Sequence, residues 1–100
     1  MSDVVYTPDS IKAVLQPVFN EYKIKKATLF GSYAKGLATP KSDVDLLLDS
    51  GLKGLGFVGL IEAIRTALDK DVDIMDITHI MPDSYIYNEI NRDGVTIYEE

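Results

Sequence analysis

The chain has 100 residues, of which 46% are hydrophobic and 26% are charged, a balance typical of a globular protein that excludes wholesale disorder. A chain of this length has room for one domain, which we expect to span residues 1–100. It contains no cysteine, which excludes disulfides and thiolate metal sites. Since it lacks a basic leader and any apolar run as long as a bilayer span, we expect a cytoplasmic protein without membrane contact.

The net charge of −6 is unevenly distributed along the chain. Residues 1–41 carry six lysines and three acidic residues, whereas residues 42–100 carry four basic and thirteen acidic residues. Proteins that grip a nucleic-acid backbone depend on Lys and Arg to neutralise phosphates, so we expect no direct nucleic-acid binding. The N-terminal lysines still favour one small polyanion, although a solvated lysine face explains Lys23, Lys25 and Lys26 at least as well.

The N-terminal part of the chain predicts one amphipathic helix. Thr7 is a suitable N-cap, and Pro8 suits the first helical position because its missing N–H would be unpaired there anyway. Apolar side chains then recur at helical spacing as far as Tyr22. Pro17 lies inside this stripe, and we expect it to kink the helix because it lacks an N–H and crowds the preceding turn.

The rest of the chain alternates predicted strands and helices. In chain order we expect a strand over 24–30, a short helix over 32–36, a strand over 44–48, a helix over 57–68, a strand over 71–77, a helix that begins at Pro82 and ends at Gly94, and a strand over 95–98. The glycine-rich stretch 51–59 matches no phosphate-binding fingerprint and is interpreted as a flexible connection. This order predicts an α/β (α+β) fold with a small sheet flanked by helices.

The most informative pattern is a Gly-Ser pair followed, after ten residues, by Asp-Val-Asp. Gly31 and Ser32 come directly after a predicted strand, where a glycine lets phosphate oxygens approach and the N–H groups of a helix start favour an anion. Asp43 and Asp45 project on one face of the next strand, because side chains alternate along a strand. We expect these two carboxylates to bind two Mg²⁺ ions about 4 Å apart, as in two-metal phosphoryl-transfer sites.

Two carboxylates rarely complete such a site, so a third is expected from a neighbouring strand. Asp73 is the best candidate, since Val72 and Ile74 on either side of it would hold it on a buried strand. Two rivals are weaker: Asp71 lies at the strand entrance, and Asp76 lies on the opposite face.

Lys35 and Ser42 lie between the Gly-Ser pair and Asp-Val-Asp, and we expect Lys35, with Ser42 as a further candidate, to reach the phosphates. The predicted reaction is in-line attack by a hydroxyl on the α-phosphorus of a nucleotide, with release of pyrophosphate. Taken singly, a Gly-Ser pair is most often a turn and an Asp-x-Asp most often a solvated acid pair, but their joint occurrence between strands favours the functional interpretation. The single histidine, His79, has no partner at ligand spacing and is interpreted as a surface residue.

The motif resembles that of the minimal nucleotidyltransferase (MNT) family of the DNA polymerase β-like superfamily, which carries Gly-Ser, ten residues and Asp-x-Asp. The residues that carry the resemblance are 30–36 and 42–47, supported by 72–74 for the third-carboxylate strand and 93–98 for the closing strand. The resemblance implies a polymerase β-like core of mixed sheet and helices, two Mg²⁺ ions, and ATP as the usual donor.

Stand-alone members of the family typically act as antitoxins, so the resemblance also implies a partner. It implies transfer of AMP to a tyrosine of a HEPN-domain toxin, an RNase. The alternative is a non-catalytic antitoxin that neutralises its partner by complex formation alone. A third possibility, transfer to a small molecule such as an antibiotic, requires a substrate domain that 100 residues supply only through an oligomer. Lys35 stands where the family commonly has Arg, and Asp69 and Asp71 lie where relatives are often glycine or basic.

Overall fold

The computed structural model describes residues 4–100. Its elements are α1 (Pro8–Tyr22), β1 (Lys26–Phe30), α2 (Gly31–Lys35), β2 (Val44–Asp49), α3 (Leu55–Leu68), β3 (Val72–Asp76), the short 3₁₀ helix η1 (Ile77–His79), α4 (Tyr85–Asp93) and β4 (Val95–Glu99). The predicted alternation of helices and strands is confirmed, with shifted ends. None of the helices in this part of the chain is both long and apolar enough to cross a membrane.

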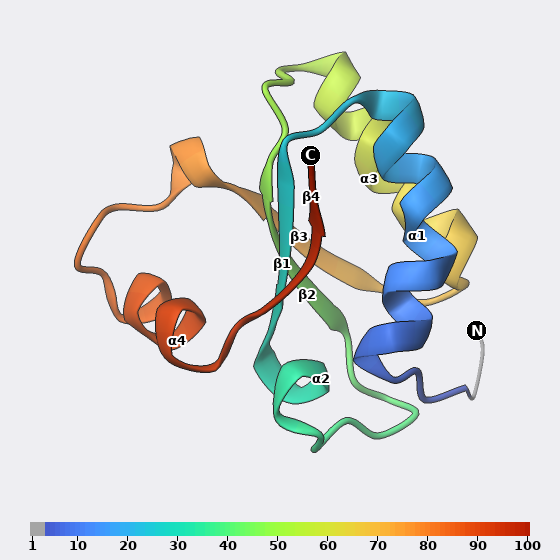
Figure 1. Ribbon diagram of the computed structural model, residues 1–100, viewed down its shortest axis with the longest axis vertical. Helices are drawn as coiled ribbons and strands as arrows, with labels where there is room; N and C mark the ends of the chain where they lie inside the picture. Colours follow the sequence, from blue (N-terminus) through green and yellow to red (C-terminus); the bar gives the residue numbers. More distant parts are fainter. Residues whose placement is uncertain (1–3) are drawn as a thin grey trace.

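The described strands form one four-stranded sheet in the order β3-β2-β1-β4. Strand β1 runs antiparallel to β2 and β4, whereas β2 and β3 are parallel, so the sheet is mixed as the resemblance implied. Helices α1 and α3 lie on one side of the sheet, and α4 lies on the other (Figure 1). The parallel register sets Asp45 of β2 directly beside Asp73 of β3.

The main core lies between the sheet and the pair α1 and α3. Its fully buried side chains include Ile11, Leu15, Phe19, Ala27, Leu29, Val44, Leu46, Leu48, Leu60, Ile64 and Leu68. A smaller cluster on the other face joins Phe30 and Leu47 of the sheet to Ile90 of α4. The apolar run 46–48 of β2 is therefore covered on both faces, as is typical of a central strand.

The start of α1 forms as predicted. Thr7 is the N-cap, and its hydroxyl accepts a hydrogen bond from the Ser10 backbone N–H at 3.1 Å. Ser10 returns the contact, since its hydroxyl accepts from the Thr7 N–H at 2.8 Å, which completes a capping box. The helix is continuous through Pro17 to Tyr22, and the kink at Pro17 stays a prediction.

The predicted start of the last helix at Pro82 is wrong. Helix α4 begins two residues beyond the following aspartate, because Ser84 is its N-cap and accepts a hydrogen bond from the Tyr87 N–H at 3.1 Å. The predicted end at Gly94 is confirmed, since Gly94 donates its N–H to the Ile90 carbonyl at 2.7 Å. A Cβ at Gly94 would lie 2.4 Å from that same carbonyl oxygen, so the close approach requires glycine.

Asp76 is a buried carboxylate that ties three segments together. It lies on the face opposite Asp73, as predicted, and is 3% exposed. One oxygen accepts from the backbone N–H and hydroxyl of Ser50 at 3.1 and 2.7 Å. The other accepts from the N–H and hydroxyl of Thr78 at 3.2 and 2.8 Å. Burial alone raises the pKa of Asp76, but the bonds from Ser50 and Thr78 outweigh it and leave the pKa below 3.8.

We expect Asp76→Asn to destabilise the protein by about 2 kcal/mol at pH 7, because an amide nitrogen replaces an oxygen that accepts two hydrogen bonds. For a chain of this size, that cost lowers the melting temperature by roughly 10 °C. The depressed pKa means that the ionised carboxylate stabilises the fold at neutral pH and loses this effect as the pH falls below 3.8. The difference in melting temperature between wild type and Asp76→Asn should therefore be smaller at pH 3 than at pH 7. The exposed Asp83→Asn control should melt near the wild-type temperature at both pH values.

Candidate active site

The Gly-Ser turn lies where β1 ends and α2 begins. Gly31 is the first residue of α2 and has a φ of +73°, a conformation that favours glycine. A Cβ there would lie 2.1 Å from Oδ2 of Asp45, so the carboxylate rests against the Gly31 backbone. The sequence predicted a glycine that lets phosphate approach, and the structure adds a second reason for it, which is the approach of Asp45. Ser32 follows in the first turn of α2 and is partly buried.

The three predicted carboxylates gather at one end of the β2–β3 pair. Asp45 and Asp73 are partners in the parallel register, and Asp43 lies one residue before β2, two residues from Asp45. Asp43 and Asp73 are exposed, whereas Asp45 is partly buried. The rivals differ in their placement: Asp71 precedes β3, and Asp76 lies on the other face.

The electrostatics of this cluster centre on Asp45. Burial is the largest cause that raises the pKa of Asp45, and together with the negative charges of Asp73, Asp43 and Glu89 it brings this pKa to about 6. Glu89, from α4, is thus a fourth carboxylate near the site, and the sequence analysis missed it. Only its position beside the buried Ile90 on an amphipathic helix hints that it turns toward the sheet.

The donor chemistry of the cluster suits a divalent cation. Carboxylate oxygens are the ligands that Mg²⁺ prefers, and a cation would relieve the repulsion that raises the pKa of Asp45. Asp43, Asp45 and Asp73 are the residues that would hold it. Within residues 4–100, no three acidic or histidine side chains converge into a formed metal site. His79 is exposed, as predicted, and packs edge-on against Phe57 with ring centroids 6.0 Å apart.

Lys35 and Ser42, the two further residues expected at the phosphates, both contact protein groups. The Lys35 ammonium lies 3.0 Å from Oε1 of Glu89 and 4.0 Å from Oδ2 of Asp93. The Ser42 hydroxyl accepts from the backbone N–H of Thr39 at 2.9 Å and so closes the loop before β2. Their contact with phosphate stays a prediction.

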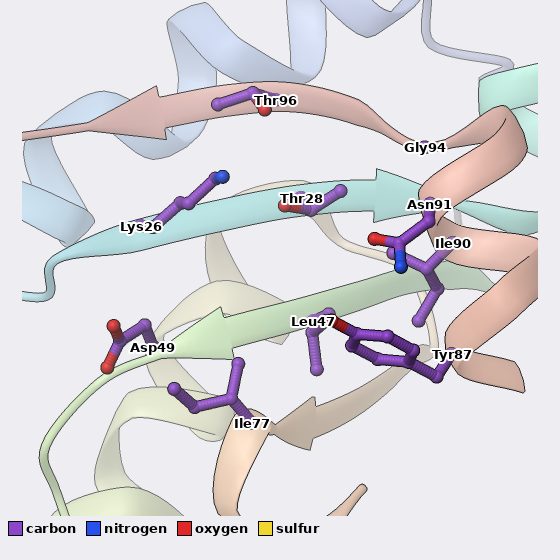
Figure 2. Close-up of a pocket in the computed structure, with 10 residues that line it drawn as sticks. All are labelled: Lys26, Thr28, Leu47, Asp49, Ile77, Tyr87, Ile90, Asn91, Gly94 and Thr96. Atoms are coloured by element: carbon purple, nitrogen blue, oxygen red, sulfur yellow. The ribbon is translucent and has the colours of Figure 1, made fainter. Parts of the chain in front are cut away.

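A pocket of about 300 Å³ lies on the same sheet face but apart from the carboxylates (Figure 2). Its floor is formed by β1, β2 and β4, and its walls by η1 and α4. The lining residues are Lys26, Thr28, Leu47, Asp49, Ile77, Tyr87, Ile90, Asn91, Gly94 and Thr96. Since Asp45 and Asp49 lie toward opposite ends of β2, this pocket does not belong to the carboxylate cluster.

We expect Asp45→Asn to raise the melting temperature at pH 7. A raised pKa means that ionised Asp45 costs stability, and this cost grows as the pH rises from about 4 to about 6. After allowance for solvent screening, Asp45→Asn should raise the free energy of unfolding by about 1 kcal/mol, which corresponds to a melting temperature about 4–8 °C higher for a domain of this size. Thermal melts should show the gain at pH 7 and little of it at pH 4. In addition, Mg²⁺ should stabilise the wild type more than the variant. A loss of stability at pH 7 would contradict this account.

We expect Gly31→Ala to destabilise the protein by about 2 kcal/mol, from backbone strain and from displacement of Asp45. Gly36→Ala is a matched control, because Gly36 has a φ of +74° but open space around its Cβ position. The control should show the strain alone, about 1 kcal/mol. In an Asp45→Ala background the two substitutions should cost the same in urea unfolding. A persistent difference would show that Gly31 does not serve the approach of Asp45.

Comparisons with known proteins place the chain in a family. Residues 13–100 match the family described as polymerase beta, nucleotidyltransferase. Two candidate protein adenylyltransferases of Methanocaldococcus jannaschii are similar in sequence. One is 32% identical over 76 residues, covering 74% of this chain and 82% of the relative. The other is 31% identical over 82 residues, covering 78% of this chain and 81% of the relative.

Solved structures share the fold at lower identity. A chain of a toxin–antitoxin complex with AMP-PNP has a TM-score of 0.75 and 22% identity, over 89% of this chain and 73% of that one. A chain from the complex of a tri-AMPylated Shewanella oneidensis HEPN toxin with its MNT antitoxin has a TM-score of 0.69 and 18% identity, over 94% of this chain and 74% of that one. The family match covers most of the chain, and the chain therefore belongs to the polymerase beta nucleotidyltransferase family.

Proposed function

We propose that this protein transfers AMP from ATP to a hydroxyl, that of a tyrosine, on a partner HEPN toxin, and that it thereby acts as an antitoxin. The observation that carries the proposal is the contact of the Gly31 turn with Asp45, beside Asp73, within a nucleotidyltransferase domain. The names of the M. jannaschii relatives support protein adenylylation. The toxin–antitoxin complexes among the structures of the same fold support the choice of partner.

In this proposal one set of residues binds the phosphates of ATP and another set binds metal. The backbone of Gly31 and the N–H and hydroxyl of Ser32 bind phosphate oxygens of ATP, with Lys35 and Ser42 as further contacts. Asp43, Asp45 and Asp73 would hold two Mg²⁺ ions, which would neutralise charge at the phosphates. Asp45 is partly buried against the turn, whereas Asp73 is exposed at the outer edge, where the acceptor of a partner has access.

The reaction then joins the partner's hydroxyl oxygen to the α-phosphorus of ATP and breaks the bond from that phosphorus to pyrophosphate. The proton of the hydroxyl passes to a site carboxylate or to water. Residues 1–100 act in this proposal as one minimal nucleotidyltransferase domain in the cytoplasm, with no direct contact to nucleic acid. The acceptor side of the site is supplied by the partner.

A non-catalytic antitoxin, which neutralises its partner by complex formation alone, is the second candidate. Two observations favour it: the three carboxylates do not converge into a formed metal site within residues 4–100, and Lys35 is paired with Glu89. Both candidates use the same partner, so they differ only in whether chemistry takes place.

Label transfer distinguishes the two candidates. ATP labelled at its α-phosphate and Mg²⁺ are mixed with the protein and the product of the adjacent gene, the proposed HEPN partner. We expect label on the partner with wild type, and a loss of about a hundredfold or more with Asp43→Asn or Asp45→Asn, because each removes a charge from the site. Asp83→Asn, an exposed change outside the site, is the control and should transfer label normally.

Full transfer by both site variants would refute the placement of the active site at these carboxylates. A partner that is bound and inhibited without any label would favour the non-catalytic antitoxin. Thermal melts of each variant show whether a lost activity reflects lost folding.

A further inference from the structure

An ion pair connects the nucleotide motif to the last helix. Lys35 is the last residue of α2, and its ammonium donates a hydrogen bond to Oε1 of Glu89 in α4 at 3.0 Å. Asp93, one turn further along α4, lies 4.0 Å from the same ammonium and also accepts from Arg92 at 3.0 Å. Glu89 is therefore the principal partner of Lys35.

Glu89 also acts on the carboxylate cluster. Its charge is among those that raise the pKa of Asp45, so Glu89 lies near the acidic end of β2 as well as beside Lys35. The side chains of Glu89 and Lys35 are only 21% and 35% exposed, so the pair is partly shielded from solvent. The positive charge nearest the Gly-Ser turn is thus already matched by a carboxylate of the same chain.

We propose that Glu89 is a positioning residue that restrains Lys35. When a nucleotide binds, the Lys35 ammonium leaves Glu89 and pairs with the phosphates. This inference rests on the nucleotide site of the proposed function. Partly exposed ion pairs are weak, whereas an ammonium bonded to a multiply charged phosphate forms a stronger, charge-assisted contact. The exchange of Glu89 for phosphate as the partner of Lys35 is therefore favourable. Because the nucleotide must compete with Glu89 for Lys35, Glu89 lowers the affinity of the site for nucleotide.

The test measures binding rather than turnover. The probe is Mg²⁺ with α,β-methylene ATP, which resists cleavage at the α-phosphorus, titrated by calorimetry into the full chain. We expect Glu89→Gln to lower the Kd by about threefold to tenfold, because Lys35 is released. Lys35→Met should raise the Kd, and adding Glu89→Gln to Lys35→Met should then leave the Kd unchanged.

The double variant separates this mechanism from simple repulsion of phosphate by Glu89. If Glu89→Gln tightens binding equally with and without Lys35, the effect is repulsion and the proposal is wrong. Unchanged or weaker binding by Glu89→Gln alone also overturns it. Glu62→Gln is the matched control, since Glu62 pairs with Arg65 on α3, across the sheet from α4, and should leave the Kd as in wild type.

The outcome also separates this inference from the proposed function. If wild type binds the probe but Glu89→Gln does not tighten it, only the role of Glu89 fails. If neither wild type nor any variant that melts normally binds the probe, the nucleotide site itself is wrong, and the role of Glu89 with it.

Discussion

The approach of the Asp45 carboxylate to the Gly31 backbone is the contact on which the rest of the site depends. Strands β1 and β2 are antiparallel and set Phe30 opposite Asp45, so the turn after β1 lies over the beginning of β2. A side chain at Gly31 would occupy the place of Oδ2 of Asp45. The Gly-Ser turn and the carboxylates therefore form one unit, although ten residues separate Ser32 from Asp43.

This closeness has an electrostatic cost that defines what the site can bind. Asp45 is partly buried among other carboxylates, which raises its pKa and disfavours its charged form. The nearest lysine of the motif does not compensate for this charge, because it is paired with Glu89. A site with crowded acids and a restrained ammonium suits a ligand that brings both cations and phosphates, as a metal-bound nucleotide does.

Much of this site was predictable from the sequence because it depends on local periodicity. Strand alternation predicts Asp43 and Asp45 on one face, and the same rule separates Asp73 from Asp76. The role of Glu89 was not predictable, because it depends on how α4 packs against the sheet through Ile90, a contact between distant segments. The start of α4 was misplaced for a local reason: Pro82 suits a first helical turn, but the Ser84 cap prevails.

The arrangement of the layers decides from which side substrates reach the site. Helices α1 and α3 close one face of the sheet with the main core, and α4 lies on the other face (Figure 1). Asp45 alternates with Val44 and Leu46 of that core, so it belongs to the α4 face, as does its register partner Asp73. In the proposed function, nucleotide and acceptor therefore both arrive on the α4 side. Asp45 lies deeper, against the turn, while Asp43 and Asp73 are exposed. The phosphates are thus expected to occupy the inner position, and the acceptor hydroxyl the outer one.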